Sequence, residues 1–536
     1  MGSSIAAFRR VIRNRRLRRL LGSFFVFVLV EMGTWVAILV WAHSAGGPGF
    51  VGLVAAIQLV FAAVAAPLLS TIGDRLPRGQ ALFVVYAAVA VTSAVTGLAL
   101  IVSAPVVVVL ILASIDAGVI GVGRPIHASL IPDLSSEPAD AVAANVASSA
   151  LEGAGTFLGP ALAGAVLLVS GPGTVFVVLG IGMLVAALSV SRMGHVARSG
   201  MLTGESEDGI LAAFRTLARI PTQRFVVVLG GVSQIVVGAL DVLTIVLAIE
   251  VLGLGESGAG FTVSLLGLGG LLGGVLAASM VGRRLGPILV LGALLRGGAL
   301  VMLGVQPAWI ALFLVSGAGF SLVDVGVRTL LQRLVPPDVM ARTFGVLESV
   351  GLLGLAGGSL LASGLIAAFG VEVALMVFGG LVPLAVALGH RLLVAADRAA
   401  DVPGGVIDAF QGTRLFGLLA PPTLEMLARR SRILQLEPGT RVIAEGETSR
   451  FVLLLVEGTV SVTKAGRHLA DLEEGDVVGE IASLQDVPRT ATVTTITEVT
   501  AISVPGDAFV MAVRGTADAW SLSTSVAGRR LAHQHT

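Results

Sequence analysis

Apolar residues fill most of the first 394 positions in long runs that are separated by short polar breaks. A helix that spans a bilayer needs about 20 mostly apolar residues, so the runs predict twelve spans in two sets of six. The first set lies near 20–42, 49–72, 81–102, 105–131, 142–169 and 173–191. The second set lies near 225–250, 258–281, 287–305, 308–334, 344–369 and 372–394.

Two polar stretches divide the chain further. Residues 192–224 contain GESEDG and predict a linker between the two sets of spans. After Val394 the chain becomes polar, and short β-like runs punctuated by glycine precede a helical tail, which predicts a soluble β-roll with flanking helices. The expected domains are 1–194 (first six-helix half), 195–222 (linker), 223–394 (second half), 395–412 (linker) and 413–536 (soluble domain).

Composition supports a membrane protein and excludes several chemistries. Only 13% of the 536 residues are charged, against about 25% in soluble proteins. The absence of cysteine excludes disulfides, thiolate metal sites and cysteine nucleophiles. Lys464 is the sole lysine, so the chain has no GxxxxGK[ST] phosphate loop. No kinase, cyclase or phosphodiesterase motif is present, and we expect no enzyme activity, metal or cofactor.

Arginines are distributed unevenly between the two sides of the predicted membrane. The N-terminal block from Arg9 to Arg19 precedes the first span, whereas the loops SAGGPG and SGPG on the opposite side carry no arginine. The arginines that share the first side are Arg75, Arg78, Arg192, Arg198, Arg283, Arg284, Arg342 and Arg398. By the positive-inside rule, we expect a multi-pass protein of the cytoplasmic membrane with both termini and the soluble domain in the cytoplasm.

One stretch of the soluble domain carries binding chemistry: GDVVGEIASLQDVPRTATV at 475–493. Glycines let backbone N–H groups converge on an anion, and the planar fork of Arg489 suits a phosphate held bidentately. Glu480 accepts hydrogen bonds when ionised and therefore suits a sugar hydroxyl. The stretch predicts a pocket for a phosphorylated ribose. The alternative is a carboxylate and an arginine on an ordinary β-roll surface.

This stretch closely resembles the phosphate-binding cassette of cyclic-nucleotide-binding domains. The resemblance implies Glu480 on the ribose 2′-hydroxyl, Arg489 on the cyclic phosphate, and cyclic AMP or cyclic GMP as a regulatory ligand. Thr490 leaves the choice of base open. The implied nucleotide site is Gly479, Glu480, Ile481, Ala482, Arg489, Thr490 and Ala491. Trp520, in the helical tail, either stacks on the base or packs on the roll.

The membrane region resembles the major facilitator superfamily, with efflux-type members the nearest in pattern. The motifs are the loop with Asp74, Arg75 and Arg78, the segment GTFLGP at 155–160, and the run GVGRPIHASLIPD at 121–133. IPD at 131–133 recurs as PPD at 336–338, as expected for two related halves. The resemblance implies twelve spans in two six-helix halves and proton-coupled antiport of a small molecule. It also implies a cytoplasmic gate in which Asp74, Arg75 and Arg78 lock the halves together.

Charged residues inside the spans are expensive and usually face a cavity or one another. The candidate substrate and proton pathway consists of Glu31, Asp116, Arg124, Glu152, Asp241, Asp324, Arg328 and Glu348. Glu31, Asp116 and Asp241 lie deepest in their spans and are the candidate proton carriers. Asp324 and Arg328, four residues apart on one helix, could instead neutralise each other, and Arg124 could be a gate or a snorkelling arginine.

Together these observations predict a secondary active exporter that is regulated allosterically by cyclic nucleotide. Its expected partners are the lipid bilayer, a small-molecule substrate, protons and the nucleotide. Too few residues follow the roll for a helix-turn-helix, so we expect no nucleic-acid binding. The alternative function is a membrane-tethered cyclic-nucleotide receptor whose transporter-like region no longer transports, and the charges inside the spans argue against it.

Overall fold

The computed structural model describes residues 11–73, 76–135, 138–191, 219–278, 284–304, 308–335, 337–400, 404–419, 421–516 and 519–526. Within these ranges, 11 helices are long and apolar enough to cross a membrane. The helices of the apolar region are α2 (Arg15–Gly73), α3 (Arg78–Ile101), α4 (Val106–Leu134), α5 (Pro138–Leu167), α6 (Pro172–Ser191), α8 (Pro221–Val246), a π-helical turn (Leu247–Val251), α9 (Gly255–Ala278), α10 (Gly286–Leu303), α11 (Trp309–Leu334), α12 (Pro337–Phe369), α13 (Val371–Leu388) and α14 (His390–Ala399).

Helix α2 covers both of the first two predicted spans. Two helices merge in it across a kink at Gly46 and Gly47, whose backbone dihedral angles are not helical. Gly47 has a φ of 69°, a value that favours glycine because a Cβ would crowd the residue's own backbone at this angle. The predicted count of twelve spans therefore depends on each part of α2 crossing the membrane separately.

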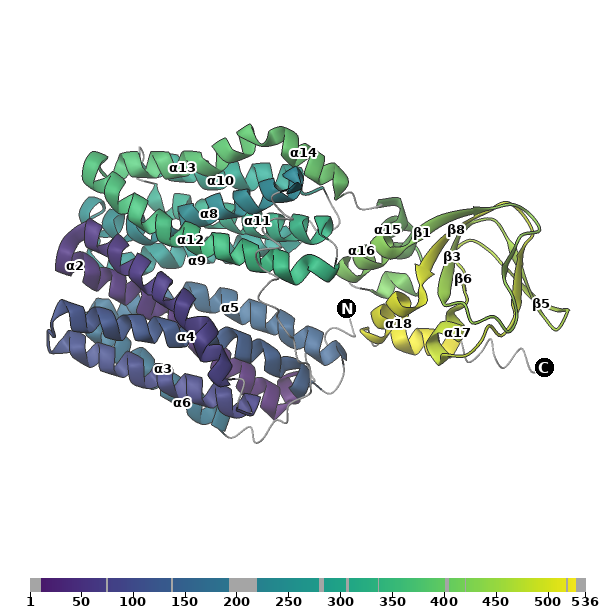
Figure 1. Cartoon of the computed structure of the whole chain (residues 1–536), viewed down its shortest axis with the longest axis horizontal. Coiled ribbons are helices and arrows are strands. Elements are labelled where there is room, and N and C mark those ends of the chain that lie inside the picture. The colour runs from purple at the N-terminus through teal and green to yellow at the C-terminus, as the bar shows by residue number, and fades with distance from the viewer. Residues whose placement is uncertain are drawn as a thin grey trace.

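The apolar helices form two groups, α2–α6 and α8–α13, that lie side by side (Figure 1). The groups meet where α12 packs on α2 and α9 packs on α5. One hydrogen bond across this contact joins Ser363 Oγ to the Pro48 carbonyl oxygen at 2.9 Å. Large apolar side chains remain exposed on the outside of the bundle, including Val169 and Leu353. Such a surface suits contact with lipid, where no water is available for polar groups.

The last predicted span, 372–394, is too long. Helix α13 ends at Leu388, and Gly389 separates it from α14, which carries charged residues on its exposed positions. Asp397 of α14 accepts hydrogen bonds from the backbone N–H groups of Leu285 and Gly286, each at 2.9 Å. Helix α14 therefore packs across the start of α10 and does not continue the span.

The soluble domain is a β-roll with helices on one side, and it lies beyond one end of the helix bundle (Figure 1). Two antiparallel four-stranded sheets have the orders β1-β8-β3-β6 and β2-β7-β4-β5. The strands are β1 (Arg432–Leu436), β2 (Arg441–Ile443), β3 (Phe451–Glu457), β4 (Val460–Lys464), β5 (Arg467–Leu472), β6 (Val477–Val478), β7 (Thr492–Thr495) and β8 (Val499–Pro505). The helices are α15 (Gly404–Gln411), a 3-10 turn (Phe416–Leu418), α16 (Pro421–Arg430), α17 (Glu480–Gln485) and α18 (Gly506–Arg514).

Two apolar clusters stabilise this domain. One joins the two sheets through residues such as Leu453 and Val493. The other packs the helices against β3 and β8, with the rings of Phe410 and Phe416 at 4.6 Å and those of Phe416 and Phe509 at 5.9 Å. Helix α15 contributes Phe410 to this second cluster, although its residues fall in the predicted linker 395–412. The packed core of the domain therefore begins before residue 413.

Candidate functional site

A cavity of about 460 Å³ opens in the β-roll, and the whole predicted nucleotide site lies on its wall. The seven predicted residues that line it are Gly479, Glu480, Ile481, Ala482, Arg489, Thr490 and Ala491. The first four come from the turn into α17 and from α17 itself, and the last three precede β7. The fold therefore brings the two parts of the sequence motif to one cavity.

The close approach of Arg489 explains the glycine at position 479. Gly479 has a φ of 82°, in the left-handed region that favours glycine. A Cβ at this position would lie 2.3 Å from Arg489 Nη1. Both observations indicate that a side chain at 479 would displace the guanidinium from its place in the cavity wall.

Arg489 is held in position by the protein. Its Nη1 donates to the Gly479 carbonyl oxygen at 2.9 Å, its Nη2 donates to the Phe451 carbonyl oxygen at 2.7 Å, and its Nε donates to Ser449 Oγ at 3.2 Å. The guanidinium also lies 4.6 Å from the centre of the Phe451 ring. Burial lowers the pKa of the Arg489 guanidinium, and the carboxylates of Glu447 and Glu480 offset part of this effect. Burial disfavours the charged form of this guanidinium, and an anionic ligand in the cavity would favour it again.

Glu480 is also buried, with 3% of its surface exposed. Its position at the start of α17 places it on the cavity wall together with Arg489. A buried carboxylate and a buried guanidinium on one cavity can bind a hydroxyl and an anionic oxygen of the same ligand. This geometry fits the pocket for a phosphorylated ribose that the sequence predicts.

The sequence did not identify the contribution of β5 to the pocket. Arg467 and His468 line the same cavity. His468 Nε2 lies 2.8 Å from Asp471 Oδ1, and this hydrogen bond holds the pKa of the Asp471 carboxyl below its usual value. The segment RHLADL carries no recognisable motif, so only the roll itself reveals these two residues. Trp520 does not line the cavity, and it packs on the helical cluster with Arg514 5.2 Å from its ring centre.

A buried ion pair joins the β-roll domain to the helix bundle. Arg333, at the end of α11, donates to Glu425 of α16 through Nε (2.5 Å to Oε1) and Nη2 (2.8 Å to Oε2). The side chains of Arg333 and Glu425 are 4% and 11% exposed. Arg429 of α16 also donates to the carbonyl oxygen of Arg333, which satisfies one of the unpaired carbonyls at the end of α11. We refer to Arg333, Glu425 and Arg429 as the interdomain contact.

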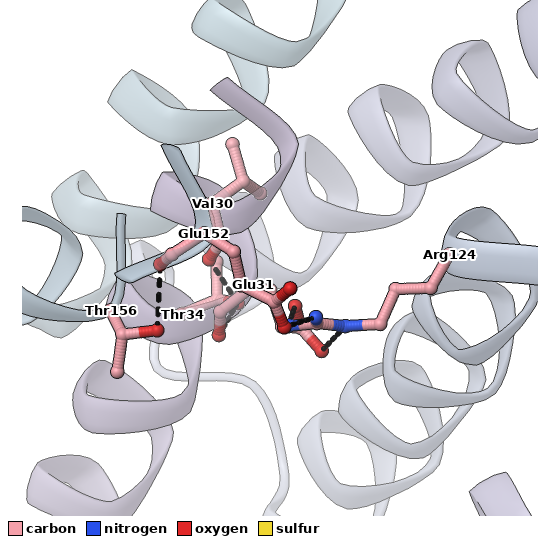
Figure 2. Close-up of polar contacts among 6 residues, drawn as sticks. All are labelled: Val30, Glu31, Thr34, Arg124, Glu152 and Thr156. Carbon is pink, nitrogen blue, oxygen red and sulfur yellow. Dashed lines mark hydrogen bonds and ion pairs between the residues drawn. The ribbon is translucent and has the colours of Figure 1, made fainter. Parts of the chain in front are cut away.

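Three charged residues of the first half meet in one cluster (Figure 2). Arg124 of α4 donates to Glu31 of α2, with 2.6 Å between Nη2 and Oε2, and to Glu152 of α5. Figure 2 shows the three side chains converging from three helices. Arg124 is therefore paired with two carboxylates.

The second half repeats part of this arrangement. Arg328 of α11 lies 3.1 Å from Asp324 on the same helix and 2.8 Å from Glu348 of α12. Asp324 and Arg328 therefore form the ion pair that their spacing on one helix allows. The pairs Arg124–Glu152 and Arg328–Glu348 each join consecutive long helices, one pair in each half, as expected for related halves.

A second cavity, of about 390 Å³, lies among the helices of the bundle. Glu31, Asp116 and Asp241 all line it. Asp116 accepts hydrogen bonds from the hydroxyls of Thr92 and Ser93, the latter at 3.0 Å. The structure thus brings the three deepest carboxylates of the sequence to one internal space.

The predicted gate is only partly described. Asp74 and Arg75 lie outside the described residues. Arg78 Nη1 lies 2.6 Å from Asp133 Oδ2 and also donates to the Ser129 carbonyl oxygen at 3.3 Å. These partners belong to α4 of the same half, so this contact of Arg78 holds α3 to α4.

Two architectures therefore share the chain: a bundle of apolar helices with carboxylates on an internal cavity, and a β-roll whose cavity is lined by Glu480 and Arg489. A family model for the Major Facilitator Superfamily matches residues 20–359, which is more than half of the chain. The chain belongs to that superfamily. A model for the cyclic nucleotide-binding domain matches residues 433–514.

Three curated proteins are similar to separate parts of the chain. The acetyltransferase Pat of Mycolicibacterium smegmatis is 39% identical over 100 residues, which are 18% of this chain and 28% of Pat. The cAMP-dependent protein kinase regulatory subunit of Yarrowia lipolytica is 44% identical over 75 residues, 14% of this chain and 20% of that subunit. The uncharacterized MFS-type transporter YfiS of Bacillus subtilis is 34% identical over 139 residues, 23% of this chain and 31% of YfiS. The chain thus spans less than a third of the length of each.

Proposed function

We propose that this protein is a proton-coupled exporter of a small molecule whose transport is regulated by cyclic AMP or cyclic GMP in the cytoplasm. The observation that carries the proposal is the interdomain contact. A bidentate ion pair that is nearly excluded from water attaches α16 of the nucleotide-binding domain to α11, and α11 also carries Asp324 and Arg328 of the second half. A change in the nucleotide pocket can therefore reach the transport region through packed helices.

The nucleotide pocket supports cyclic AMP or cyclic GMP as the regulatory ligand. Arg489 would bind the cyclic phosphate and Glu480 the ribose 2′-hydroxyl, because these two buried groups line one cavity of about 460 Å³. Phosphate oxygens would compete for a guanidinium that now donates to the carbonyl oxygens of Gly479 and Phe451. Binding would therefore rearrange the turn into α17, which packs on α18, and α18 in turn packs on α16.

The internal cavity supports coupled transport. Glu31, Asp116 and Asp241 line it from helices of both halves, and rocking of two related halves would expose such a cavity to each side in turn. Carboxylates in an apolar cavity can bind and release protons as access alternates. The direction of transport, which we propose is export, is inferred from the segment at 155–160 and the run at 121–133, because both resemble efflux-type members of the superfamily. Asp74, Arg75 and Arg78 would close the cytoplasmic side.

The arginine distribution supports a cytoplasmic location for both termini and for the nucleotide-binding domain. Arg342 precedes the eleventh predicted span and Arg398 follows the twelfth. Cyclic nucleotides made in the cytoplasm would then reach the pocket directly. Coupling between two sites in one protein is typically about 1–3 kcal/mol, or roughly 5–150-fold in an equilibrium.

Purified protein in liposomes tests the proposal. A pH gradient should drive flux of at least one compound from a broad panel, and cyclic nucleotide on the side of the nucleotide-binding domain should change the rate. Arg489→Ala should abolish the nucleotide effect and keep the flux. The matched control is Arg450→Ala, which removes another arginine of the domain, exposed and paired with Asp486 at 2.6 Å. Nucleotide binding without flux of any compound would support the alternative function, a membrane-tethered receptor.

A further inference from the structure

The internal cavity lies where the two halves of the bundle meet. Glu31, Trp35 and Gln58 of α2 and Asp116 of α4 line it from the first half, and Asp241 of α8 lines it from the second. Its volume of about 390 Å³ falls in the range of small-molecule sites, roughly 300–1,000 Å³. The cavity is therefore large enough for an organic molecule and not only for protons or ions.

The ionisable side chains on the cavity wall are all acidic. The lining residues include three carboxylates and no arginine, lysine or histidine. Arg124 pairs with Glu31 at 2.6 Å, but the other two carboxylates have neutral donors. Asp241 accepts from Trp35 Nε1 at 3.2 Å, and Asp116 accepts from two hydroxyls. In the described part of the chain neither aspartate forms an ion pair, so a cation in the cavity would meet two carboxylates that lack a counter-charge.

Gln58 provides a separate indication of a ligand. It lines the same cavity, is 3% exposed, and its Nε2 has no hydrogen-bond partner among the described residues. A buried donor without a partner is costly, and native proteins rarely keep one without a reason. The amide nitrogen can only donate, so a ligand that satisfies it must carry an acceptor oxygen or nitrogen.

The rest of the wall is largely apolar and includes two aromatic side chains, Trp35 and Phe176. An apolar wall binds a hydrophobic body, and the face of an indole ring attracts a cationic group. Because Asp241 accepts from the indole N–H of Trp35, the carboxylate and the ring are adjacent. A single ligand can therefore contact both.

We infer that this cavity binds amphiphilic organic cations that carry a hydrogen-bond acceptor. The inference rests on the proposed transport function and names the substrate class of the same site. Asp116 and Asp241 bind the positive charge, Trp35 and Phe176 contact the apolar body, and Gln58 donates to the acceptor. A neutral molecule of the same size lacks the first of these interactions.

Equilibrium binding to the full chain in lipid nanodiscs tests this inference with three probes. Tetraphenylphosphonium is an apolar cation without an acceptor, triphenylphosphine oxide is a neutral aromatic with one, and rhodamine 6G is a cation with an ester acceptor. The cations should bind at least tenfold more tightly than the neutral oxide. Asp116→Asn and Asp241→Asn should each weaken tetraphenylphosphonium binding by about tenfold or more. Gln58→Leu should weaken rhodamine 6G by about fivefold and leave tetraphenylphosphonium unchanged.

Glu250→Gln is the matched control, because it neutralises a carboxylate of the bundle that does not line this cavity and lies 2.9 Å from His43 Nε2. It should leave all three affinities unchanged. Equal binding of the cations and the neutral oxide by the unmodified protein would overturn the inference, even if an aspartate variant fails to fold. Unchanged cation affinity in both folded aspartate variants would overturn it as well.

The binding assay needs no gradient and no flux, so it separates this inference from the proposed function. Proton-driven flux of a neutral compound, with no binding of either cation, would overturn the inference and leave the transport function standing. Binding of the cations with the expected variant effects, but with no flux of any compound, would support the inference and overturn the transport function.

Discussion

Arg333→Met should detach the nucleotide-binding domain from the bundle while leaving both folded. The substitution removes both hydrogen bonds to Glu425 and leaves that carboxylate, 11% exposed, without its counter-charge. The unpaired carboxylate of Glu425 can be hydrated only if α16 moves away from α11.

The magnitude follows from the burial of the pair. Removing one partner of a buried ion pair costs about 3–5 kcal/mol, and each 1.4 kcal/mol corresponds to about tenfold in an equilibrium. Undocking should therefore become more favourable by a factor of roughly 10² to 4 × 10³. Replacing both partners by apolar residues is often neutral or stabilising, so Arg333→Met combined with Glu425→Leu should restore docking.

The assay uses the fact that the chain has no cysteine. Arg284→Cys on the bundle and Glu474→Cys on the β-roll introduce two unique labelling sites, and both positions are exposed. Distances between spin labels at these sites should form a narrow distribution in the otherwise unmodified chain and a broad one in Arg333→Met. The double apolar variant should return to the narrow distribution.

The matched control is the same substitution in the neighbouring ion pair. Arg430→Met breaks an exposed pair with Asp507, whose side chains are 45% and 65% exposed, and such pairs contribute about 0–1 kcal/mol. It should leave the distances unchanged. If Arg333→Met also leaves them unchanged, the ion pair does not hold the domains together and the proposed route of regulation is wrong.

Three further predictions concern the two sites, and a fourth concerns an exposed ion pair of the β-roll domain. Arg489→Ala should weaken cyclic-nucleotide binding by about 1.5–3 kcal/mol, the range for hydrogen bonds to charged groups; equal affinity by calorimetry would contradict the phosphate contact. Gly479→Ala should weaken it too, because the new Cβ meets Arg489 Nη1 at 2.3 Å, and a crystal structure of the variant should show a displaced guanidinium. Asp241→Asn should abolish gradient-driven flux in liposomes, and normal flux would remove this residue from the proton pathway. The hydrogen bond from Arg430 lowers the pKa of the Asp507 carboxyl, so it stabilises the domain above the usual aspartate pKa of about 3.9, and this contribution is lost as the pH falls through the lowered value. Arg430→Met should therefore reduce the unfolding temperature at pH 7, and the reduction should shrink as the pH is lowered into the acid range.

The nucleotide pocket could be predicted from the sequence because its chemistry is local. Gly479, Glu480 and Arg489 fall within eleven residues, and all three line the same cavity. The wall formed by β5 could not be predicted in the same way. Arg467 and His468 reach the cavity only because the roll pairs β4 with β5 and with β7.

The contacts among the charged residues in the spans, in contrast, could not be predicted from the sequence. Hydropathy identified Glu31, Arg124 and Glu152 as exceptional, but it could not say which of them meet, because pairing depends on how each helix is rotated about its axis. Gln58 could not be predicted from the sequence, because a single uncharged polar residue in a long apolar run carries little signal. The interdomain contact joins positions 92 residues apart, and neither Arg333 nor Glu425 belongs to a recognisable motif.

The covalent connection between the two domains has a consequence for affinity. Helix α14 ends at Ala399 and α15 begins at Gly404, so the nucleotide-binding domain is tethered within a few residues of the bundle. A short tether sets an effective local concentration on the order of millimolar. A contact too weak to form between separate molecules at micromolar concentration can therefore be well occupied within this chain. The interdomain contact therefore suffices to keep the nucleotide-binding domain docked on the bundle. Because such a contact need not be strong, the binding of a small ligand can reverse it.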